Sequence, residues 1–141
     1  MDSRSCVFCD VLAGRRSGSF VHRGDLVAAF LTIGPINPGH ALIVPLRHAA
    51  GIADLTDAET EAIFSLARRV SAALRGSSIA CEGINYWLAD GEAAFQDVFH
   101  VHLHVFPRFV GDSFKVEFER RTPPRQELDR IAQTISSCLK E

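Results

Sequence analysis

The chain has 141 residues, which fits a single domain over 1–141, and its 15 Lys and Arg against 17 Asp and Glu give a formal net charge of −2. The composition, 47% hydrophobic and 23% charged, is typical of globular proteins and excludes a disordered, collagen-like or coiled-coil chain. The balanced charge offers no single-sign field for nucleic acid or a membrane surface. Because no apolar run is long enough for a signal peptide or a membrane span, we expect a cytoplasmic protein with neither partner.

The first predicted elements are short and are separated by Gly and Pro. Breakers are densest over 34–39, where prolines and glycines predict a rigid, irregular connection. The elements around it are a short helix or turn over 4–13, a strand pair over 21–22 and 26–31 with its turn at 23–25, and a strand over 40–44 that Pro45 ends.

The clearest helix signal follows. Thr56 and Glu59 have the spacing of a capping box, with Thr56 as the N-cap. Apolar residues then recur at helical spacing, and Gly76 is expected just beyond the end of the helix. The apolar positions are Ile63, Leu66, Ala67, Val70, Ala73 and Leu74.

The second half of the chain predicts two more strands and a terminal helix. The strands cover 84–89 and 99–106, and Pro107 is expected to end the second. A terminal helix follows two prolines and carries on one face Leu128, Ile131, Ile135 and Cys138. Because no βαβ alternation is visible, the order of elements favours an α+β fold with an antiparallel sheet.

Four cysteines in a chain without a leader indicate reduced thiols rather than a disulfide framework. Cys6 and Cys9 form a close pair. Such a pair is by itself a weak metal signal and is often just two small buried residues. Cys81 and Cys138 lie in apolar patterns that predict core positions.

Three histidines at alternating positions, His100, His102 and His104, are the strongest functional feature. On a strand, alternate side chains share one face, so the three imidazoles would project together while the apolar residues between them face the core. The residues alone leave two interpretations open: a face that ligates zinc, or a nucleophilic imidazole supported by the other two. Gln96 and Asp97 come just before, and this set of donors suits a phosphate better than a closed metal cage.

The three histidines and the two apolar residues after them resemble the motif of the histidine triad (HIT) nucleotide-binding proteins. The similarity extends to Cys6-Val7-Phe8-Cys9, Phe30-Leu31-Thr32-Ile33, Pro38-Gly39-His40, Ile43-Val44-Pro45, His48 and Gly91-Glu92-Ala93-Ala94-Phe95-Gln96. It covers residues 6–114 and leaves 115–141 as a C-terminal extension. The resemblance implies a five-stranded antiparallel sheet with one long helix, and a homodimer in which two sheets join into a ten-stranded one.

The resemblance also implies a reaction. The protein would be a nucleotidyl hydrolase or transferase that acts at the α-phosphorus of a nucleoside phosphoramidate or a dinucleoside polyphosphate. His102 would attack and form a covalent nucleotidyl-histidine, and water would then release a nucleoside monophosphate. His104 would contact the phosphate, and His100 would support the site. Gln96 would donate to an α-phosphate oxygen, and Asp97 would reach the leaving group.

By the same resemblance, a purine nucleotide would be held by Val7, Phe8, Phe30, Thr32, Ile33 and Leu42, although each apolar member also fits an ordinary core. The chain departs from the family pattern at four positions. Thr32 replaces an acidic residue that binds both ribose hydroxyls, Phe95 a glycine, Asp97 a serine or threonine, and Ala89 a phosphate-binding asparagine. These changes leave two alternatives open: a catalytically weak nucleotide-binding or scaffold module, and a phosphorolytic nucleotidyl transferase.

Some members of this family, and the related uridylyltransferases, bind zinc through a similar cysteine pair and two histidines. The resemblance therefore implies one zinc ion on Cys6, Cys9, His48 and His100, and no organic cofactor. A set of two cysteines and two histidines leaves no open coordination position, so the role of this zinc would be structural.

Overall fold

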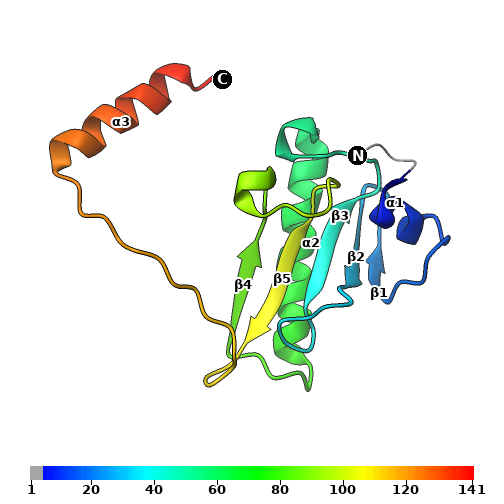
Figure 1. The fold of residues 1–141 in the computed structure, drawn as a ribbon. Coiled ribbons are helices and arrows are strands. Elements are labelled where there is room, and N and C mark those ends of the chain that lie inside the picture. The colour runs from blue at the N-terminus through cyan, green and yellow to red at the C-terminus, as the bar shows by residue number, and fades with distance from the viewer. Residues whose placement is uncertain (1–4) are drawn as a thin grey trace.

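The computed structural model describes residues 5–141; residues 1–4, which include the start of the helix expected over 4–13, lie outside the described part of the chain. Five strands form one antiparallel sheet in the order β1-β2-β3-β5-β4. They are β1 (Phe20–Arg23), β2 (Val27–Leu31), β3 (Ala41–Pro45), β4 (Gly83–Trp87) and β5 (Leu103–Arg108). The predicted α+β class and antiparallel sheet are confirmed (Figure 1).

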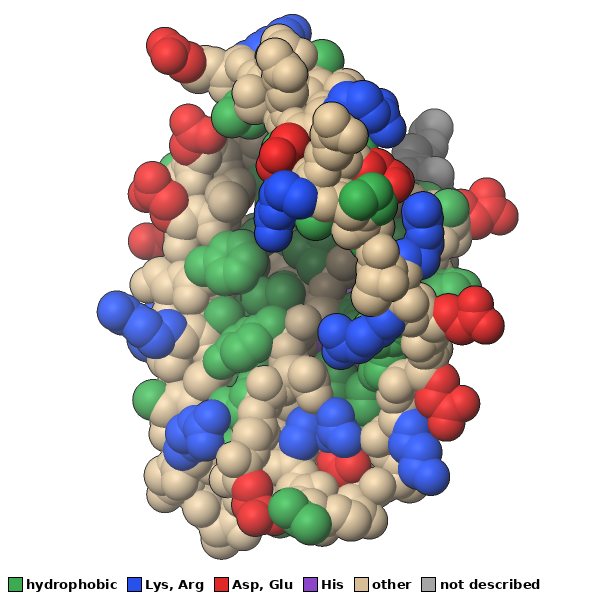
Figure 2. Space-filling view, turned by 90° about the vertical axis from the view of Figure 1, so that its left-hand side faces the viewer, with side chains coloured by type: hydrophobic (Ala, Val, Ile, Leu, Met, Phe, Trp, Pro, Cys, Tyr) green, Lys and Arg blue, Asp and Glu red, His purple; other side chains and the backbone are tan. Residues whose placement is uncertain are grey.

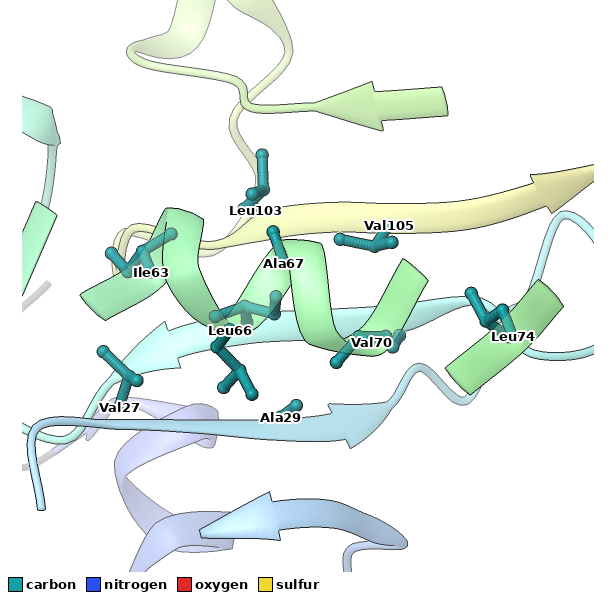
Figure 3. Packing of buried hydrophobic residues seen from close by; sticks show 11 residues of the cluster. Val27, Ala29, Ile63, Leu66, Ala67, Val70, Leu74, Leu103 and Val105 are labelled. Carbon is teal, nitrogen blue, oxygen red and sulfur yellow. The ribbon is translucent and has the colours of Figure 1, made fainter. Parts of the chain in front are cut away.

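The long helix α2 (Asp57–Gly76) covers one face of the sheet. Its apolar side packs against alternate residues of three neighbouring strands, as Figure 3 shows for Leu66 and Val70 above Ala29 and Val105. Every second residue of these strands points to this helix. The resulting cluster of buried residues is larger than the one on the opposite face of the sheet. Its members on α2 are Ile63, Leu66, Ala67, Val70 and Leu74.

The short helix α1 (Val7–Leu12) lies against the opposite face. Phe8 and Val11 pack there on Phe30 of β2 and on Leu42 and Val44 of β3. Because Leu42 pairs with His104 in the sheet register, the side chain of His104 on β5 shares this face with α1. The sheet therefore separates the core under α2 from a face that carries the chemistry.

The bounds expected for the last strand, 99–106, are wrong at both ends, because β5 runs from Leu103 to Arg108. The segment before Leu103 is anchored to a neighbouring loop instead of a strand: the Val101 amide donates to the Ala49 carbonyl over 2.7 Å. At the other end, β5 continues through Pro107 to Arg108, paired with β4. The Pro107 carbonyl accepts from Asn37, on the side where β3 no longer pairs, so the missing N–H interrupts no ladder there.

Other boundaries differ by a few residues. The strand expected over 84–89 runs from Gly83 to Trp87. Gly76 is the last residue of α2, and Ser77 is the C-cap. The strand pair near the N-terminus is confirmed, and β3 lies one residue later at each end than the strand expected over 40–44, because it includes Pro45 and excludes His40.

The C-terminal helix α3 (Arg125–Cys138) is present as predicted, but none of its residues is buried. Cys138 is exposed, so its predicted core position is wrong, and Cys81 is half-buried. Figure 1 shows α3 held away from the sheet at the end of an extended segment. No helix of the described residues is long and apolar enough to cross a membrane.

The predicted capping box at the start of α2 is confirmed and extends to an arginine. The Glu59 carboxylate accepts from the Thr56 amide over 2.8 Å and from two nitrogens of Arg47 over 3.0 and 2.8 Å. The Arg47 hydrogen bonds, followed by the Thr56 amide, lower the pKa of Glu59 from its ordinary 4.5 to about 2. This lowering means that folding favours the charged form of Glu59.

We expect Glu59→Gln to lower the free energy of unfolding by about 1–2 kcal/mol at neutral pH, because it removes the charge from a buried cap. This expected loss of unfolding free energy is modest because half of the Arg47 side chain is exposed to solvent. A folded-state pKa below 4.5 gives stability that is present above pH 4.5 and is lost as the pH falls toward 2. The difference between wild type and variant should therefore shrink over that range.

Denaturant unfolding of both proteins at neutral pH and at about pH 3 measures this difference. Glu61→Gln is the matched control, because Glu61 is exposed on the same turn. We expect it to change stability by less than about 0.5 kcal/mol. A Glu59→Gln effect of equal size at both pH values would contradict the role given to the charge.

Candidate functional site

The site lies where the chain enters β5. His100 and His102 precede the strand and His104 lies within it, beside Leu42 on β3 and Trp87 on β4. The rings of His102 and His104 are neighbours, with centroids 4.8 Å apart, whereas His100 turns toward the N-terminal cysteines. The three imidazoles are close together, but two of them come from an irregular segment and not from the strand that the alternation predicts.

His100 is fully buried and is held on both sides of its ring. Its Nε2 lies 2.9 Å from the Pro45 carbonyl oxygen, and since a carbonyl only accepts, Nε2 carries the proton and donates. Burial lowers the pKa of His100, so the ring is neutral and the other nitrogen, Nδ1, has a lone pair. That lone pair faces the thiols of Cys6 and Cys9 at 3.4 and 3.5 Å.

His102 is held by the backbone of His100. Its Nδ1 donates to the His100 carbonyl oxygen over 2.8 Å. Burial lowers the pKa of His102, so the ring is neutral and the Nε2 lone pair is available. Phe8 packs edge-on against this ring with centroids 5.0 Å apart and limits its rotation. The arrangement defines the tautomer of His102 as Nδ1–H with a nucleophilic Nε2.

His104 receives its orientation from His40, a residue that the sequence predicts to be supporting or core but for which it indicates no partner. The Ile36 amide donates to His40 Nδ1 over 3.0 Å, so the proton of the buried, neutral His40 ring is on Nε2. His40 Nε2 then donates to His104 Nδ1 over 2.9 Å. Burial, with His102 and His40 nearby, lowers the pKa of His104 to about 4, so its single proton is on Nε2.

The sequence carried a weak signal for His40. It follows Pro38 and Gly39 at the entry to a buried strand, where a polar side chain needs a partner. That partner is 64 residues away along the chain, so the pairing becomes visible only once β3 and β5 are aligned.

Gln96 has partners other than the phosphate expected for it. Its Nε2 donates to the carbonyl oxygens of Ala50 and Val98 over 2.7 and 3.1 Å, and its Oε1 accepts from the Gly91 amide over 2.8 Å. Both N–H groups are therefore engaged, and the side chain fastens the turn η3 (Glu92–Ala94) and the loop before the histidines to the loop after β3. In this conformation the Gln96 side chain holds the backbone of these loops in place.

Asp97 is exposed and accepts from the Val98 amide over 2.9 Å. Its negative charge raises the pKa of His102 and His104, but burial of the two rings outweighs it. Phe95, just before Gln96, is 82% exposed and has a φ of 69°, in the left-handed region that favours glycine. Ala89 is buried.

The residues expected to hold a nucleotide divide into two groups. Phe8, Phe30 and Leu42 are buried in the core under α1, with Val7 packed beside them. Ile33 is fully exposed, and Thr32 is half-buried with its hydroxyl oxygen accepting from the Gly34 amide over 3.2 Å. Phe8 of the first group packs against the His102 ring, and the second group lies nearer the surface.

Cys6, Cys9, His48 and His100 are brought together by α1, by the loop after β3 and by the segment before β5. One ligand atom of each lies within 4.8 Å of the others, so these residues can hold a metal ion. Each thiol lies 3.4 Å from a histidine Nδ1, Cys6 from that of His100 and Cys9 from that of His48. A zinc tetrahedron with bonds of ~2.0–2.3 Å has edges of roughly 3.3–3.8 Å, so these spacings fit. Without a metal, burial and the Cys6 thiol raise the pKa of Cys9 to about 11.

The fold and this site define a class: a small antiparallel α+β protein with a neutral, tautomer-defined histidine cluster beside a Cys₂His₂ group that can hold a metal ion. Residues 14–111 match the family model described as the HIT domain, and the chain belongs to this family. An uncharacterized HIT-like protein of Borreliella burgdorferi is 38% identical over 91% of both chains.

Two solved structures are similar over nearly the whole chain. A HIT family protein from Bacillus anthracis superposes with a TM-score of 0.90 at 32% identity, over 96% of this chain and 98% of the other. A zinc-bound histidine triad family protein from Mycobacterium smegmatis has a TM-score of 0.76 at 34% identity, over 96% of this chain and 99% of the other.

We expect the protein to bind one divalent metal ion per chain, and Cys9→Ser to weaken that binding by about tenfold or more, because the hydroxyl is a poor zinc ligand. Metal content after dialysis and the loss of thermal stability on adding a chelator measure this. Cys81→Ser is the matched control, because the Cys81 thiol donates to the Gly83 carbonyl outside the cluster. Equal metal content in the two variants would contradict the assignment.

Proposed function

We propose that the protein is a nucleotidyl hydrolase or transferase that acts at the α-phosphorus of a nucleoside phosphoramidate or a dinucleoside polyphosphate, with His102 as the nucleophile. The observation that carries the proposal is the hydrogen bond from His102 Nδ1 to the His100 carbonyl. It leaves an unprotonated Nε2 on a ring held in place by Phe8. A fixed neutral imidazole with a lone pair aimed away from its anchor is what a covalent histidine nucleophile needs.

The reaction has two displacements. In the first, the Nε2 lone pair of His102 forms a bond to phosphorus, and the bond from phosphorus to the leaving nitrogen or oxygen breaks with its electron pair. In the second, water forms a bond to the same phosphorus and the phosphorus–Nε2 bond breaks. The leaving nitrogen or oxygen takes up one proton from solvent and the attacking water gives one proton to solvent, so that one water is added overall. The products are the protonated leaving group, a nucleoside monophosphate and neutral His102.

His104 supplies a hydrogen-bond donor to the reacting group. Because His40 donates to its Nδ1, His104 presents an N–H at Nε2, next to the His102 ring. A neutral donor aimed at a phosphoryl oxygen stabilises the charge that develops there. His100 and Gln96 act through the backbone: His100 holds His102 with its carbonyl, and Gln96 holds the preceding loop.

In this proposal a purine nucleotide lies on the side of the apolar residues around Phe8, with its ribose toward Thr32. The Thr32 oxygen already accepts one amide, but its hydroxyl proton is free to donate to a ribose hydroxyl. Thr32 therefore provides fewer ribose hydrogen bonds than a carboxylate would.

A catalytically weak nucleotide-binding or scaffold module is the second candidate, and three observations favour it. Asp97 places a negative charge near the histidines, where it repels a phosphate. Ala89 offers no side-chain donor, and the Gln96 amide has no N–H left. A phosphorolytic transferase would use the same intermediate with inorganic phosphate in place of water.

Zinc is the metal that the cluster suits best, because cysteine and histidine are its preferred ligands and all four positions are filled by protein. The zinc-bound relative from Mycobacterium smegmatis supports this choice. The ion would join the N-terminal helix to the segment before β5. Its thiolate ligands and the exposed Cys138 suit the reducing cytoplasm.

A homodimer joined through β4 is the assembly that the sheet supports. Of the two edges of the sheet, β1 carries a register irregularity between Phe20 and His22, and the Arg23 guanidinium stacks on Phe20. The edge strand β4 has no charged residue and exposes Tyr86 and Trp87. Pairing of two such edges would produce the ten-stranded sheet.

We expect a short incubation with an adenosine phosphoramidate or a diadenosine polyphosphate to leave an adenylyl group on the wild type and none on His102→Ala. Intact-protein mass spectrometry after a quench that preserves phosphoramidates measures the adduct. Wild type that binds nucleotide but forms neither adduct nor monophosphate would contradict the hydrolase and support the binding module. A diphosphate product that requires added phosphate would identify the transferase.

We expect His40→Leu to release the tautomer of His104 and to lower kcat by about tenfold or more with a smaller change in KM. His40→Gln keeps an N–H donor near the position of Nε2 and should recover part of the loss. Two-bond ¹H–¹⁵N spectra read the His104 tautomer directly: Nε2–H in the wild type, a mixture in His40→Leu. An unchanged His104 tautomer in His40→Leu would refute the positioning role.

A further inference from the structure

The long helix α2 leaves the edge strand β1 uncovered. The core under α2 takes buried residues from β2, β3 and β5 and, among the described residues, none from β1. Figure 3 shows the helix above Val105 of β5 and Ala29 of β2, with β1 lying beyond Ala29. A step between the helix and the edge strand therefore remains on this face of the sheet.

A bulge turns two successive side chains of β1 toward this step. Phe20 pairs with Phe30, which belongs to the core on the face of α1. His22 pairs with Ala29, which belongs to the core on the face of α2, and the register shifts between the two pairs. Val21 lies at the shift and lines the same hollow as His22. Because side chains of a regular strand alternate, the bulge gives the step one side chain more than a regular strand would.

One end of the step is an apolar hollow of about 300 Å³. Small residues leave this space open, since Ala73 of α2 has a single methyl group and Gly39 has no side chain. A Cβ at Gly39 would lie 2.9 Å from Leu74 Cδ2, so the backbone itself forms part of the lining. Concave apolar surface that stays open to solvent is typical of a ligand site. The large side chains of the lining that remain 37–50% exposed are Val21, Leu31 and Ile79.

The apolar hollow continues into a polar one of about 200 Å³. The second hollow adds His22 and Arg69 to the lining. Arg69 is exposed and makes no ion pair with any residue of 5–141, including Asp25 in the adjoining hollow. The two hollows thus form one continuous groove, the β1 groove, with an apolar end and a cationic end. The residues that they share are Val21, Val70 and Ala73.

The two ends of the β1 groove select the chemistry of a ligand. The lining of the apolar end has no charged side chain and no aromatic ring, so it neither binds a polyphosphate nor stacks a base. If each methylene takes about the 30 Å³ of a water molecule in the liquid, this end holds roughly ten carbons. At the other end, the planar guanidinium of Arg69 can bind a carboxylate through two parallel hydrogen bonds. A hydrocarbon chain with one carboxylate matches both ends.

We propose that the β1 groove binds a free medium-chain fatty acid, with its chain beside Val21, Leu31 and Ile79 and its carboxylate on Arg69. The groove lies on the face of the sheet opposite to the histidine cluster and at the edge opposite to β4. Figure 2 shows the β4 side of the molecule, where other hydrophobic side chains gather in a hollow between charged ones. The proposed dimer would cover that side and leave the β1 groove open. The fatty-acid site therefore depends neither on the proposed reaction nor on the proposed assembly.

Isothermal titration calorimetry of the full chain with octanoate tests the proposal. 1-Octanol and butyrate separate the two ends of the groove, because the first lacks the charge and the second lacks the chain. Ala73→Leu fills the apolar end, and Ala72→Leu, at the exposed neighbouring position of α2, is its control. Arg69→Gln removes the charge, and Arg68→Gln is its control, because Arg68 lines a different hollow with Tyr86 of β4. Thermal unfolding confirms that each variant is folded.

We expect octanoate to bind the wild type and both controls once per chain, and butyrate to show no binding. Ala73→Leu should weaken octanoate binding about tenfold or more, because the new side chain occupies the space of the ligand. Arg69→Gln should weaken octanoate binding about fivefold or more and leave 1-octanol binding unchanged, because it removes a charge-assisted hydrogen bond. In methyl spectra, the signals of Leu31 and Ile79 should shift on binding, and those of Val7 on the face of α1 should not.

Four outcomes would overturn the fatty-acid site. The first is the absence of saturable octanoate binding, and the second is equal binding by Ala73→Leu and the wild type. Equal affinities for octanoate and butyrate would show an anion site without a pocket for the chain. Sedimentation with phosphatidylglycerol vesicles, without binding of free octanoate, would assign the surface to a membrane instead. None of these outcomes bears on the His102 adduct, so the failure of this site and the failure of the proposed reaction are distinguishable.

Discussion

The buried ring of His100 is the contact on which the rest of the site depends. With Nε2–H bound to the Pro45 carbonyl, its Nδ1 lone pair can only face the two thiols, and its own carbonyl is left to hold His102. A single residue thus orients the cysteine–histidine cluster on one side and the His102 ring on the other. Because the ring is fully buried, loss of either hydrogen bond would leave an unpaired polar atom in the core.

Hydrogen bonds with the backbone determine the tautomers of three of the four rings. A carbonyl can only accept and an amide can only donate, so the Pro45 and His100 carbonyls and the Ile36 amide leave His100, His102 and His40 one neutral form each. The chain of donors then reaches His104 through His40. Burial keeps these rings neutral by lowering their pKa values, which explains how four imidazoles can share one small volume without mutual charge repulsion.

The sequence predicted those features that depend on local pattern. Alternation placed Leu103 and Val105 in the core under α2, and the spacing of Thr56 and Glu59 located the start of that helix. The sequence could not predict features that depend on how the strands align with one another. His40 meets His104 only because β3 pairs with β5, and the segment before Leu103 leaves the ladder because Ala49 accepts the Val101 amide. The side-chain amide of Gln96 is likewise of the type that binds phosphate, but its partners are backbone groups in two other loops.

The six-residue helix α1 is too short to be stable alone. It begins at Cys6, and in our proposal a metal ion shared with His48 and His100 would fasten it over the face that holds the histidines. Phe8 of α1 packs edge-on against the His102 ring, so a metal that fixes α1 would also restrain that ring. Trp87 of the edge strand β4 pairs with His104, so the proposed pairing of two β4 edges would restrain the neighbouring ring. The proposed metal and the proposed dimer would therefore act on two adjacent imidazoles, the metal through Phe8 on His102 and the dimer through β4 on His104.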